Sequence, residues 1–568
     1  MPHGSAAAVD YQKTVFPYRR SPDQDTAGPA RHPVVVVGAG PVGLALAIDL
    51  ALQQVPVVLL DNDDRLSSGS RAICFAKRTL EIFDRLGCGE AMMAKGVSWN
   101  LGKVFFRDEQ LYQFNLQPES GHERPAFINL QQYYVEGFLA ERAAQLPLID
   151  LRWKNAVTAI EQHADHAVLT VDTPDGPYRL SAAHVAACDG SKSALRRLLG
   201  QESHGRSFRD RFLIADVKMK ADFPSERWFW FDPPFHPNQS VLLHKQPDDV
   251  WRIDFQLGWD ADPEVEKRPE NIVPRVRTML AHTAMKDAEF ELEWASVYTF
   301  ACLRMDSFRH GRVLFAGDSA HGVSPFGARG ANSGVQDAEN LAWKLAAVFH
   351  GRAGDALLAS YGPEREAAAD ENIRNSTRAT DFITPKSEVS RLFRDATLEL
   401  AKDHAFARTL VNSGRLSVPA TLHGSALNTP DLDHFEGRLV PGAPCADAPI
   451  VVVDGRPAWL LRQLPSGSFS ALLFDGPGTA ATAAMLQDAA GDIAPLQVLR
   501  VVTLGAPGVP ALPGVRDLVD AEGLLTQRFD GAPGTLVLLR PDQHVCARWR
   551  APAAAAVKAA LKRALALH

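Results

Sequence analysis

The clearest hydrophobic pattern begins at Pro33, where four consecutive valines occupy 34–37. A continuous β-branched run is typical of a strand whose two faces are both buried. A glycine-rich segment follows, then an apolar helical pattern over 44–53 and a second apolar run over 55–60. Strand, helix and strand within about 30 residues predict a β-α-β unit with a right-handed crossover.

The pattern changes after about residue 207. The segment 251–257 alternates apolar and polar residues at period two, as in a half-buried antiparallel strand. The segments 212–219, 241–244 and 291–300 are similar. We therefore expect a mainly antiparallel sheet over 207–300, inserted into the first domain.

Parallel-strand signals return at 312–316, and a helix is predicted over 334–349 because its apolar residues recur at helical spacing. The chain then divides into a flexible polar tail over 1–32, in which 15–18 could dock locally, and five further parts. These are the first part of a Rossmann-like domain (33–206), the inserted sheet (207–300), the second part with additional helices (301–416), a Pro/Gly/Asn-rich linker (417–447) and an α/β C-terminal domain (448–568).

Composition narrows the class of protein without naming an activity. Apolar residues make up 46% of the 568 positions and charged residues 22%, as in ordinary globular proteins. The net charge of −7 gives no overall attraction to nucleic acid or anionic membranes. No signal-peptide core or spanning segment is visible, and the six cysteines form no C-x-x-C or metal-ligand spacing. We expect a cytoplasmic protein with reduced thiols and no metal site.

The segment Gly38-Ala39-Gly40-Pro41-Val42-Gly43 matches G-x-G-x-x-G between the first strand and helix. The first glycine permits a tight turn, the second lets the backbone approach a pyrophosphate, and the third lets the helix pack on the strand. The helix N-terminus then offers free N–H groups to the anion. Asp61 ends the second strand and is placed to accept hydrogen bonds from ribose hydroxyls. This fingerprint predicts a dinucleotide site but does not separate FAD from NAD.

Two further strands end in short acidic motifs. The first is followed by Asp189-Gly190, and the second by Gly317-Asp318 and then by the turn 325–332, which contributes Pro325, Gly327, Arg329, Gly330, Ala331 and Asn332. Each motif alone could be an ordinary turn at a strand end.

Together and in this order, the three motifs resemble the single-component (group A) FAD-dependent aromatic hydroxylases with the p-hydroxybenzoate hydroxylase fold. The resemblance covers about 33–384 and includes Arg71 in Ser-Arg-Ala, Gln132 in Gln-Tyr-Tyr-Val-Glu, and Tyr-Gly-Pro-Glu-Arg at 361–365. The length is most similar to the phenol-hydroxylase and 3-(3-hydroxyphenyl)propionate-hydroxylase types. That likeness implies a thioredoxin-like C-terminal domain, here without C-x-x-C and so expected to serve packing or oligomer formation.

The resemblance implies roles for these residues. Arg71 would contact the FAD pyrophosphate, Gln132 the ribityl region and Asp318 a ribityl hydroxyl. Backbone N–H groups of 327–332 would stabilise negative charge on the flavin pyrimidine edge. Pro325 would lie beside the isoalloxazine. Asp189 would touch FAD and, transiently, the nicotinamide cofactor, and Arg329 would either set the local potential or point to solvent.

The implied reaction uses NADH or NADPH to reduce FAD, after which O2 forms a C4a-hydroperoxide that transfers oxygen to an activated phenol. Deprotonating the phenol needs a base or relay, for which His244, Tyr298 and His321 are candidates. The aromatic run 228–231 could line the pocket or simply pack in the sheet core. Arg227, Arg252 and Arg304 could bind a substrate carboxylate, although surface ion pairs are the preferred interpretation of all three.

Three functions remain open at this point. The first is NAD(P)H- and O2-dependent hydroxylation of a phenolic compound in aromatic catabolism. The second is a flavin oxidase or dehydrogenase on the same scaffold, and the third a non-catalytic flavin-fold binding protein. A homodimer is expected from similarity to other members of the family.

Overall fold

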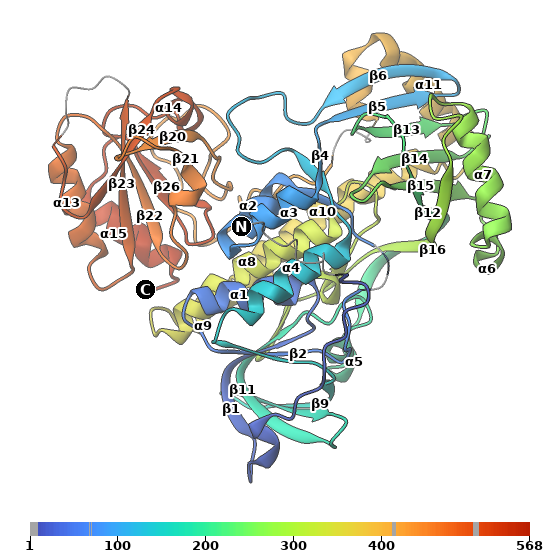
Figure 1. The fold of residues 1–568 in the computed structure, drawn as a ribbon. Helices are drawn as coiled ribbons and strands as arrows, with labels where there is room; N and C mark the ends of the chain where they lie inside the picture. The colour runs from blue at the N-terminus through green and yellow to red at the C-terminus, as the bar shows by residue number, and fades with distance from the viewer. Residues whose placement is uncertain (1–9, 68, 70, 412–415, 504–509, 568) are drawn as a thin grey trace, which may run out of the picture.

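The computed structural model describes residues 10–67, 69, 71–411, 416–503 and 510–567 (Figure 1). Within this part of the chain the strands form three large sheets and one small three-stranded sheet. In Figure 1 the C-terminal sheet stands to one side of a central group of helices, with the other two large sheets below and to the right of that group.

The first sheet is parallel at its centre. Its main path runs β17-β18-β11-β1-β2-β8, and β9 and β10 extend it from β11 as antiparallel strands. The parallel strands are β1 (Ala30–Val37), β2 (Val57–Leu60), β8 (Ile149–Arg152), β11 (Tyr178–Ala187) and β18 (Val313–Phe315). The others are β9 (Ala156–Gln162), β10 (Ala167–Asp172) and β17 (Arg309–His310).

Helices α1 (Pro41–Leu52), α4 (Gln132–Ala144) and α8 (Gly330–Phe349) pack side by side against this sheet. Because β1, β11 and β18 are parallel neighbours, the segments that follow them meet at one edge of the sheet. The glycine-rich turn and both acidic motifs therefore converge there.

The second sheet has the order β19-β16-β12-β15-β14-β13-β5-β6, and all neighbours except β13 and β5 are antiparallel. Its strands are β5 (Leu101–Phe106), β6 (Glu109–Asn115), β12 (Ser203–Met219), β13 (Arg227–Phe231), β14 (Ser240–Lys245), β15 (Val250–Leu257), β16 (Phe290–Met305) and β19 (His321–Gly322). The mainly antiparallel prediction is confirmed. The sheet nevertheless extends beyond 207–300, because β5 and β6 come from 101–115. Strand β5 pairs with β13, more than a hundred residues later, and β6 pairs with β5.

The two faces of this sheet separate the aromatic run 228–231. Trp230 lies on the outer face, which packs against α7 (Pro269–Ala281) through Ile272, Val276 and Met279. Phe229 and Phe231 lie on the opposite, inner face, in a cluster that also contains Phe212, Leu242, Phe300 and Phe326. Phe326 follows Pro325, so the turn after β19 rests directly on the inner face.

The predicted flexible tail is packed against the first domain from residue 10 onward. Tyr11 is buried and donates to Glu141 at 2.6 Å, and Phe16 stacks on Trp153 with ring centroids 4.4 Å apart. The segment 15–18 therefore docks as expected, while the interpretation of 10–32 as loosely held is wrong. Residues 1–9 lie outside the described part of the chain.

Other helices and strands connect these layers. They are α2 (Lys77–Leu86), α3 (Gly89–Lys95), α5 (Ala194–Leu198), α6 (Pro263–Glu266), α9 (Asp355–Ala359), α10 (Tyr361–Ile383), α11 (Glu388–Asp403), α12 (Ala405–Leu410), and the small sheet β3 (Cys74–Ala76), β7 (Phe127–Asn129), β4 (Val97–Trp99).

The C-terminal unit is a seven-stranded sheet in the order β21-β20-β24-β23-β22-β25-β26. Strands β22 (Phe469–Phe474), β23 (Leu496–Thr503) and β24 (Val515–Asp520) are parallel, and the rest pair antiparallel: β20 (Pro449–Val452), β21 (Pro457–Trp459), β25 (Leu536–Leu539) and β26 (Val545–Trp549). Its helices are α13 (Thr479–Ala490), α14 (Leu524–Phe529) and α15 (Ala554–Ala564). The expected α/β class is present; the likeness to thioredoxin stays a prediction.

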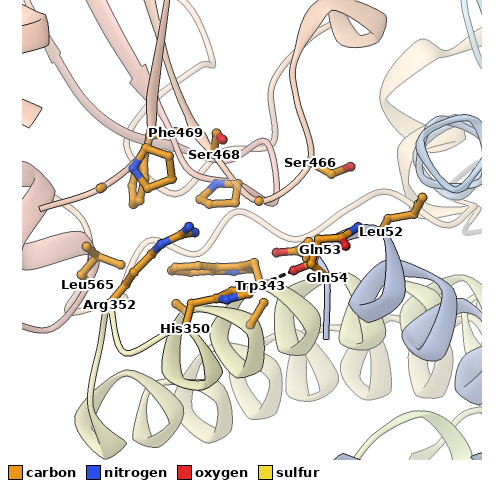
Figure 2. A pocket seen from close by; sticks show the side chains of 16 residues that line it. Leu52, Gln53, Gln54, Trp343, His350, Arg352, Ser466, Ser468, Phe469 and Leu565 are labelled. Atoms are coloured by element: carbon orange, nitrogen blue, oxygen red, sulfur yellow. Dashed lines mark hydrogen bonds between the residues drawn. The ribbon is translucent and has the colours of Figure 1, made fainter. Parts of the chain in front are cut away.

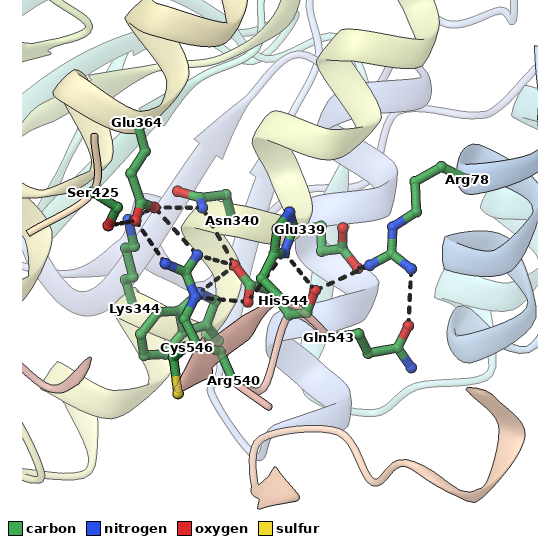
Figure 3. Close-up of polar contacts among 12 residues, drawn as sticks. Arg78, Glu339, Asn340, Lys344, Glu364, Ser425, Arg540, Gln543, His544 and Cys546 are labelled. Carbon is green, nitrogen blue, oxygen red and sulfur yellow. Dashed lines mark hydrogen bonds and ion pairs between the residues drawn. The ribbon is translucent and has the colours of Figure 1, made fainter. Parts of the chain in front are cut away.

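A buried ionic network joins this unit to α8 and α10 (Figure 3). The Arg540 guanidinium donates to Glu364 at 2.6 Å and pairs with Asp542 at 2.5 Å, while Lys344 reaches Glu364 at 2.7 Å. Burial alone would raise the pKa of Glu364, but Arg540 and Lys344 hold it well below its usual range. Ser425, from the predicted linker, also hydrogen-bonds to Glu364. The linker and the C-terminal unit are thus fixed to the helices behind the first sheet.

Candidate functional site

The turn after β1 is held in a defined shape by the edge of the sheet. The Gly38 N–H donates to the Leu60 carbonyl at 2.7 Å, and the Ala39 N–H donates to Asp61 Oδ2 at 2.6 Å. The other oxygen of Asp61 accepts from the Asp63 N–H at 2.8 Å, and burial raises the pKa of this carboxyl group. Asp61 therefore stabilises the glycine turn as well as standing where the sequence expects a ribose partner.

The three glycines of the turn have different surroundings. Gly38 adopts φ +105°, and a Cβ there would overlap the Cys188 carbonyl. A Cβ at Gly43 would overlap the Gly38 carbonyl oxygen, so this glycine lets α1 pack against the turn. A Cβ at Gly40 would meet nothing within 4 Å. Gly40 therefore faces open space at the N-terminus of α1, followed by Pro41 in the first turn.

Asp189 and Gly190 follow β11 at the same edge. Asp189 Oδ2 accepts from the Leu195 N–H at 3.0 Å, while its Oδ1 is buried and has no hydrogen-bond partner among the described residues. Gly190 has φ +74° and open space where a side chain would be. One oxygen of Asp189 thus orients the following segment, and the other has hydrogen-bonding capacity left for a ligand.

Gly317 and Asp318 form the turn after β18. Gly317 has φ +62°, and a Cβ there would stand 2.9 Å from a methyl group of Val42 on α1. The Asp318 carboxylate accepts no hydrogen bond within the described chain. The Asp318 side chain reaches solvent, but protein surrounds it closely. The resulting desolvation raises the pKa of the carboxyl group, and the charges of His321 and Arg71 oppose this rise. Tyr298, whose pKa is also raised by burial, lies within the electrostatic range of Arg71 and Asp318.

His321 does not face open space. It is 2% exposed, and its Nε2 lies 2.7 Å from Asp337 Oδ2. Asp337 also accepts from the Gly317 N–H at 2.9 Å and from Arg365 Nε at 2.6 Å. Burial favours the neutral acid, but Arg365 and His321 lower the pKa of Asp337 below its ordinary value. Through Asp337, this buried cluster fixes the Gly317–Asp318 turn. His321 is therefore a positioning residue.

The turn 325–332 leads into the N-terminus of α8. Pro325 is exposed, whereas Arg329 is 4% exposed and donates to Asn372 Oδ1 at 3.0 Å, so Arg329 does not point to solvent. Asn332 accepts from the Ala76 N–H at 2.8 Å and donates to the Cys74 carbonyl at 2.9 Å. The free N–H groups of the first α8 turn, which begins at Gly330 and Ala331, therefore lie beside β3 and close to Asp318.

Gln132 and Arg71 lie on the facing loop. Gln132 accepts from the Ala72 N–H at 3.1 Å and donates to Glu136 at 2.7 Å, which ties α4 to the loop that carries Arg71. Ser70, which precedes Arg71, lies outside the described residues. Arg71 is exposed toward the same space as Asp318.

His244 lies on the inner face of the second sheet rather than at the edge where the glycine turn lies. It is 3% exposed, its Nε2 is 3.5 Å from Asp254 Oδ2, and burial lowers its pKa to about 4. Of the three candidate bases, Tyr298 is therefore the one that is only partly buried and lies within the electrostatic range of both Arg71 and Asp318.

The three candidate arginines differ sharply. Arg304 forms a partly exposed ion pair with Asp370, as expected. Arg252 forms a buried pair with Asp216 at 2.8 Å, and Arg227 is buried without an ion pair to any residue that the structure describes. The surface interpretation is therefore wrong for both.

A model of the family described as an FAD binding domain matches residues 31–376. The chain belongs to this family of FAD-dependent monooxygenases. It is 30% identical to a 3-(3-hydroxy-phenyl)propionate/3-hydroxycinnamic acid hydroxylase of Mycolicibacterium smegmatis over 65% of this chain and 64% of that one. It is 31% identical to a 12-dehydrotetracycline 5-monooxygenase/anhydrotetracycline 6-monooxygenase of Streptomyces rimosus over 91% of this chain and 95% of that one. The resemblance predicted from the motifs is confirmed.

Two further comparisons agree. A probable NADH-specific resorcinol 4-hydroxylase of Rhodococcus jostii is 31% identical over 72% of this chain and 75% of that one. The crystal structure of the flavin-dependent monooxygenase PieE, in complex with FAD and substrate, superposes with a TM-score of 0.76 at 21% identity, covering 95% of this chain and 100% of that one. The last likeness concerns the fold alone.

The residues of this monooxygenase fit FAD at the strand edge. Open space over Gly40 and Gly190, the unpartnered Asp189 Oδ1 and the uncommitted Asp318 carboxylate are features that a dinucleotide would satisfy. Bound there, the pyrophosphate would meet the α1 N-terminus and Arg71, and the flavin would meet Asp318 and the N-terminus of α8.

A separate pocket of the monooxygenase lies away from these residues (Figure 2). It has a volume of about 240 Å³ and lies between the end of α8 and the C-terminal unit, where Trp343, His350 and Phe469 line it. It contains none of the predicted cofactor or substrate residues.

Sequence reasoning missed the role of Asp337, which carries the Gly317–Asp318 turn. Its partner Arg365 was visible only as the last residue of the motif at 361–365. In the structure the Tyr, Glu and Arg side chains of that motif are all buried. Tyr361 donates to the Phe315 carbonyl at 2.7 Å. Glu364 binds Arg540, and Arg365 binds Asp337. The motif fixes α10 behind the cofactor edge.

Proposed function

We propose that this monooxygenase hydroxylates a phenolic compound in aromatic catabolism, using FAD, reduced nicotinamide and O2. The observation that carries the proposal is one of placement. Asp318, Arg71 and the α8 N-terminus lie at the border of an inner sheet face that is lined by Phe212, Phe229 and Phe300. Aromatic walls bind flat ligands well, and relatives of this chain are named for hydroxylating phenolic substrates.

The chain's own residues supply binding, orientation and exclusion of water. When bound and reduced, FAD supplies the electrons that activate O2. The N–H groups of the α8 N-terminus favour negative charge at the edge of the cofactor that faces them. Phe326 packs against Phe212 and Phe300 with ring centroids 4.8 and 5.5 Å apart, closing the inner face against water near Pro325.

Tyr298 is the proposed hydrogen-bond partner of the substrate hydroxyl. Because burial raises its pKa, Tyr298 is protonated at neutral pH and can donate to an ionised phenol. With a pKa of about 4, His244 is a weak base at neutral pH, and His321 is committed to Asp337. Tyr298→Phe should lower turnover while leaving FAD bound.

The test is NADH and NADPH oxidation by the FAD-loaded protein against a panel of phenols, with mass analysis of products. The proposal requires that a phenol raises nicotinamide consumption and yields a product heavier by one oxygen atom. Peroxide formation without oxygen insertion would instead support an oxidase, and a protein that binds no flavin would support a non-catalytic role.

We also propose a homodimer and a reducing, cytoplasmic location. Apolar side chains are exposed along one side of α11 and on α12, including Val389, Leu392, Phe393 and Phe406, and a second copy would cover them. All six cysteines are free. No helix in the described ranges is long and apolar enough to span a membrane. Light scattering of the wild type and of Phe393→Asp tests the dimer, which the variant should dissociate.

A further inference from the structure

The pocket of Figure 2 lies where three distant segments of the chain meet. Residues 52–54 at the end of α1 and residues 343–352 at the end of α8 line one side, and residues 466–469, which lead into β22, line the other. Both helices begin at the cofactor edge, at Pro41 and Gly330. At 1.5 Å per residue, the length of α8 places the pocket about 20–30 Å from the helix N-terminus. The pocket is therefore a second site, apart from the one that fits FAD.

The walls of the pocket are aromatic and held in place. Trp343 and Phe469 are each 2% exposed, and their rings meet edge to face at 83° with centroids 6.3 Å apart. Trp343 Nε1 donates to Asp542 at 3.0 Å, which fixes the orientation of the indole. Leucine and proline side chains extend the apolar lining: Leu52, Pro495, Pro541 and Leu565. Preformed aromatic walls of this kind suit a flat ring.

The size of the pocket limits the ligand to one ring. Its volume is about 240 Å³. An apolar protein cavity of about 150 Å³ holds a benzene molecule, whereas sites for drug-sized ligands begin at about 300 Å³. The pocket therefore has room for a benzene ring with a short side chain, but not for a fused multi-ring compound.

The polar side chains of the pocket have unused hydrogen-bonding capacity. Arg352 lines the pocket and also reaches solvent, and Figure 2 shows it extending from the end of α8 toward the space between Trp343 and Phe469. Its guanidinium has no hydrogen-bond or ion-pair partner among the described residues. The same holds for the Ser466 and Ser468 hydroxyls, which also line the pocket. These groups can all donate to a ligand oxygen.

The charges around the pocket favour an anionic ligand. None of the described residues that line it is Asp or Glu. The acids that hydrogen-bond to lining residues are already paired, Asp49 with Arg85 at 2.9 Å and Asp542 with Arg540 at 2.5 Å. The positive charge of Arg352 is thus not balanced within the pocket, and a planar guanidinium matches a carboxylate well.

We propose that this pocket binds a single-ring aromatic carboxylate, with the ring between Trp343 and Phe469 and the carboxylate on Arg352. The proposal does not rest on the proposed function, because the pocket contains none of the residues assigned to FAD or to the phenol.

A ligand in this position contacts α1, α8 and the C-terminal unit together. His350 already joins the two helices, since its Nε2 lies 2.8 Å from the Gln53 carbonyl oxygen. The carboxylate would join both helices to residues 466–469. Because a ligand that binds only the docked arrangement stabilises that arrangement, the acid would act as an effector that holds the C-terminal unit against α1 and α8.

The test uses the FAD-loaded full-length protein without nicotinamide. The probes are phenylacetate and 3-phenylpropionate, their primary amides, which remove the charge, and acetate, which removes the ring. Calorimetric titration measures binding, and the rate of limited proteolysis within 417–447 measures docking of the C-terminal unit. Wild type should bind at least one aromatic acid about tenfold more tightly than its amide, as hydrogen bonds to charged groups provide, and more tightly than acetate. The same acid should slow the cleavage.

Variants locate the site. Arg352→Gln should abolish both the preference for the acid and the slower cleavage, and Arg352→Lys should retain part of each. Arg516, an exposed arginine of β24 that does not line the pocket, supplies the matched control, because Arg516→Gln should behave as wild type. Ala347→Leu adds volume inside the pocket and should block the acid and the amide alike. Since Arg352 is exposed, Arg352→Gln should melt with wild type in the absence of ligand.

An acid that binds equally well to wild type and to Arg352→Gln, or that ignores Ala347→Leu, would occupy another site and overturn the proposal. Acids that bind no more tightly than their amides would also overturn it. Binding through Arg352 that leaves the cleavage rate unchanged would overturn the effector role. None of these results depends on hydroxylation of a phenol, so failure here and failure of the proposed function are read from separate assays.

Discussion

Asp337 Oδ2 lies 2.7 Å from Nε2 of His321, and both side chains are buried directly behind the turn that carries Asp318. The same carboxylate binds the Gly317 N–H and Arg365. Asp337 therefore supports the turn, while Asp318 presents its carboxylate to the cofactor space and accepts no hydrogen bond from the part of the chain that the structure describes. The two aspartates, twenty residues apart, should respond to mutation in different ways.

Asp337→Asn should destabilise the protein, because it leaves the Arg365 guanidinium buried without its counter-charge. We expect a loss of about 3–5 kcal/mol in the free energy of unfolding, measured by denaturant titration of the apoprotein. Asp370→Asn, which breaks the partly exposed pair with Arg304, is the control and should cost less than about 1 kcal/mol. Equal effects of the two changes would contradict the role given to Asp337.

Asp318→Ala should spare folding and weaken FAD binding. Since Asp318 makes no hydrogen bond within the described chain, its removal leaves no protein group unsatisfied. We expect apoprotein stability within about 0.5 kcal/mol of wild type, together with a flavin content that drops on dialysis. Full FAD occupancy in the purified variant would show that the ribityl site is misplaced.

Gly40 and Gly43 offer a matched pair within one turn. Gly43→Ala forces a Cβ into the Gly38 carbonyl and should destabilise the apoprotein by about 1–3 kcal/mol. Gly40 has φ −74° and open space at its Cβ position, so Gly40→Ala should cost less than about 1 kcal/mol yet weaken FAD binding. Thermal melts of the apoproteins and FAD titrations separate the two effects. A Gly40→Ala variant that binds FAD normally would argue that the pyrophosphate lies elsewhere.

The strand-end motifs were predictable because the physics that defines them is local. A buried valine run, a turn that only glycine permits and a helix start fall within a dozen residues, and parallel pairing then brings Gly38, Asp189 and Asp318 to one edge. The Rossmann-like domain and its dinucleotide site followed from these segments, whereas the choice of FAD followed from the resemblance of the three motifs to the family.

Properties that depend on a distant partner were not predictable in the same way. Whether His321 is a base or a support depends on Asp337 and Arg365, and nothing in the local pattern joins them. Likewise, β5 pairs with β13 across more than a hundred residues, and the unpaired state of Arg227 depends on which side chains the sheet register places around it.

The pH dependence of stability should reflect buried neutral histidines. Burial lowers the pKa of His184 to about 4, with Arg312 adding to the effect, against 6.5 in an unfolded chain. Below pH 6.5, His184 binds a proton in the unfolded state but not in the folded state, so the free energy of unfolding falls as the pH drops toward 4. Below pH 4 both states bind the proton, and the contribution of His184 no longer changes. The loss from His184 amounts to about 3 kcal/mol over that window.

His184→Gln should therefore flatten the stability curve between pH 6.5 and 4, measured by urea denaturation at intervals of pH. His204 is exposed and serves as the control, because His204→Gln should leave the slope unchanged. A wild-type slope retained in His184→Gln would mean that carboxyl groups alone carry the acid sensitivity.

Attachment of the C-terminal unit should depend on Arg540, which lies between Glu364 of α10 and Asp542 of its own unit (Figure 3). Arg540→Ala leaves these two buried carboxylates facing each other without a cation, apart from Lys344 beside Glu364, and we expect a cost of about 3–5 kcal/mol. The unit should then loosen from α8 and α10, so that limited proteolysis cuts within 417–447 faster than in wild type. Arg456→Ala removes an exposed pair with Asp454 in the same unit and should leave the cleavage rate unchanged. If both variants were cut at the wild-type rate, apolar contacts such as those of Trp343 with Phe469 would have to hold the unit in place without the ionic network.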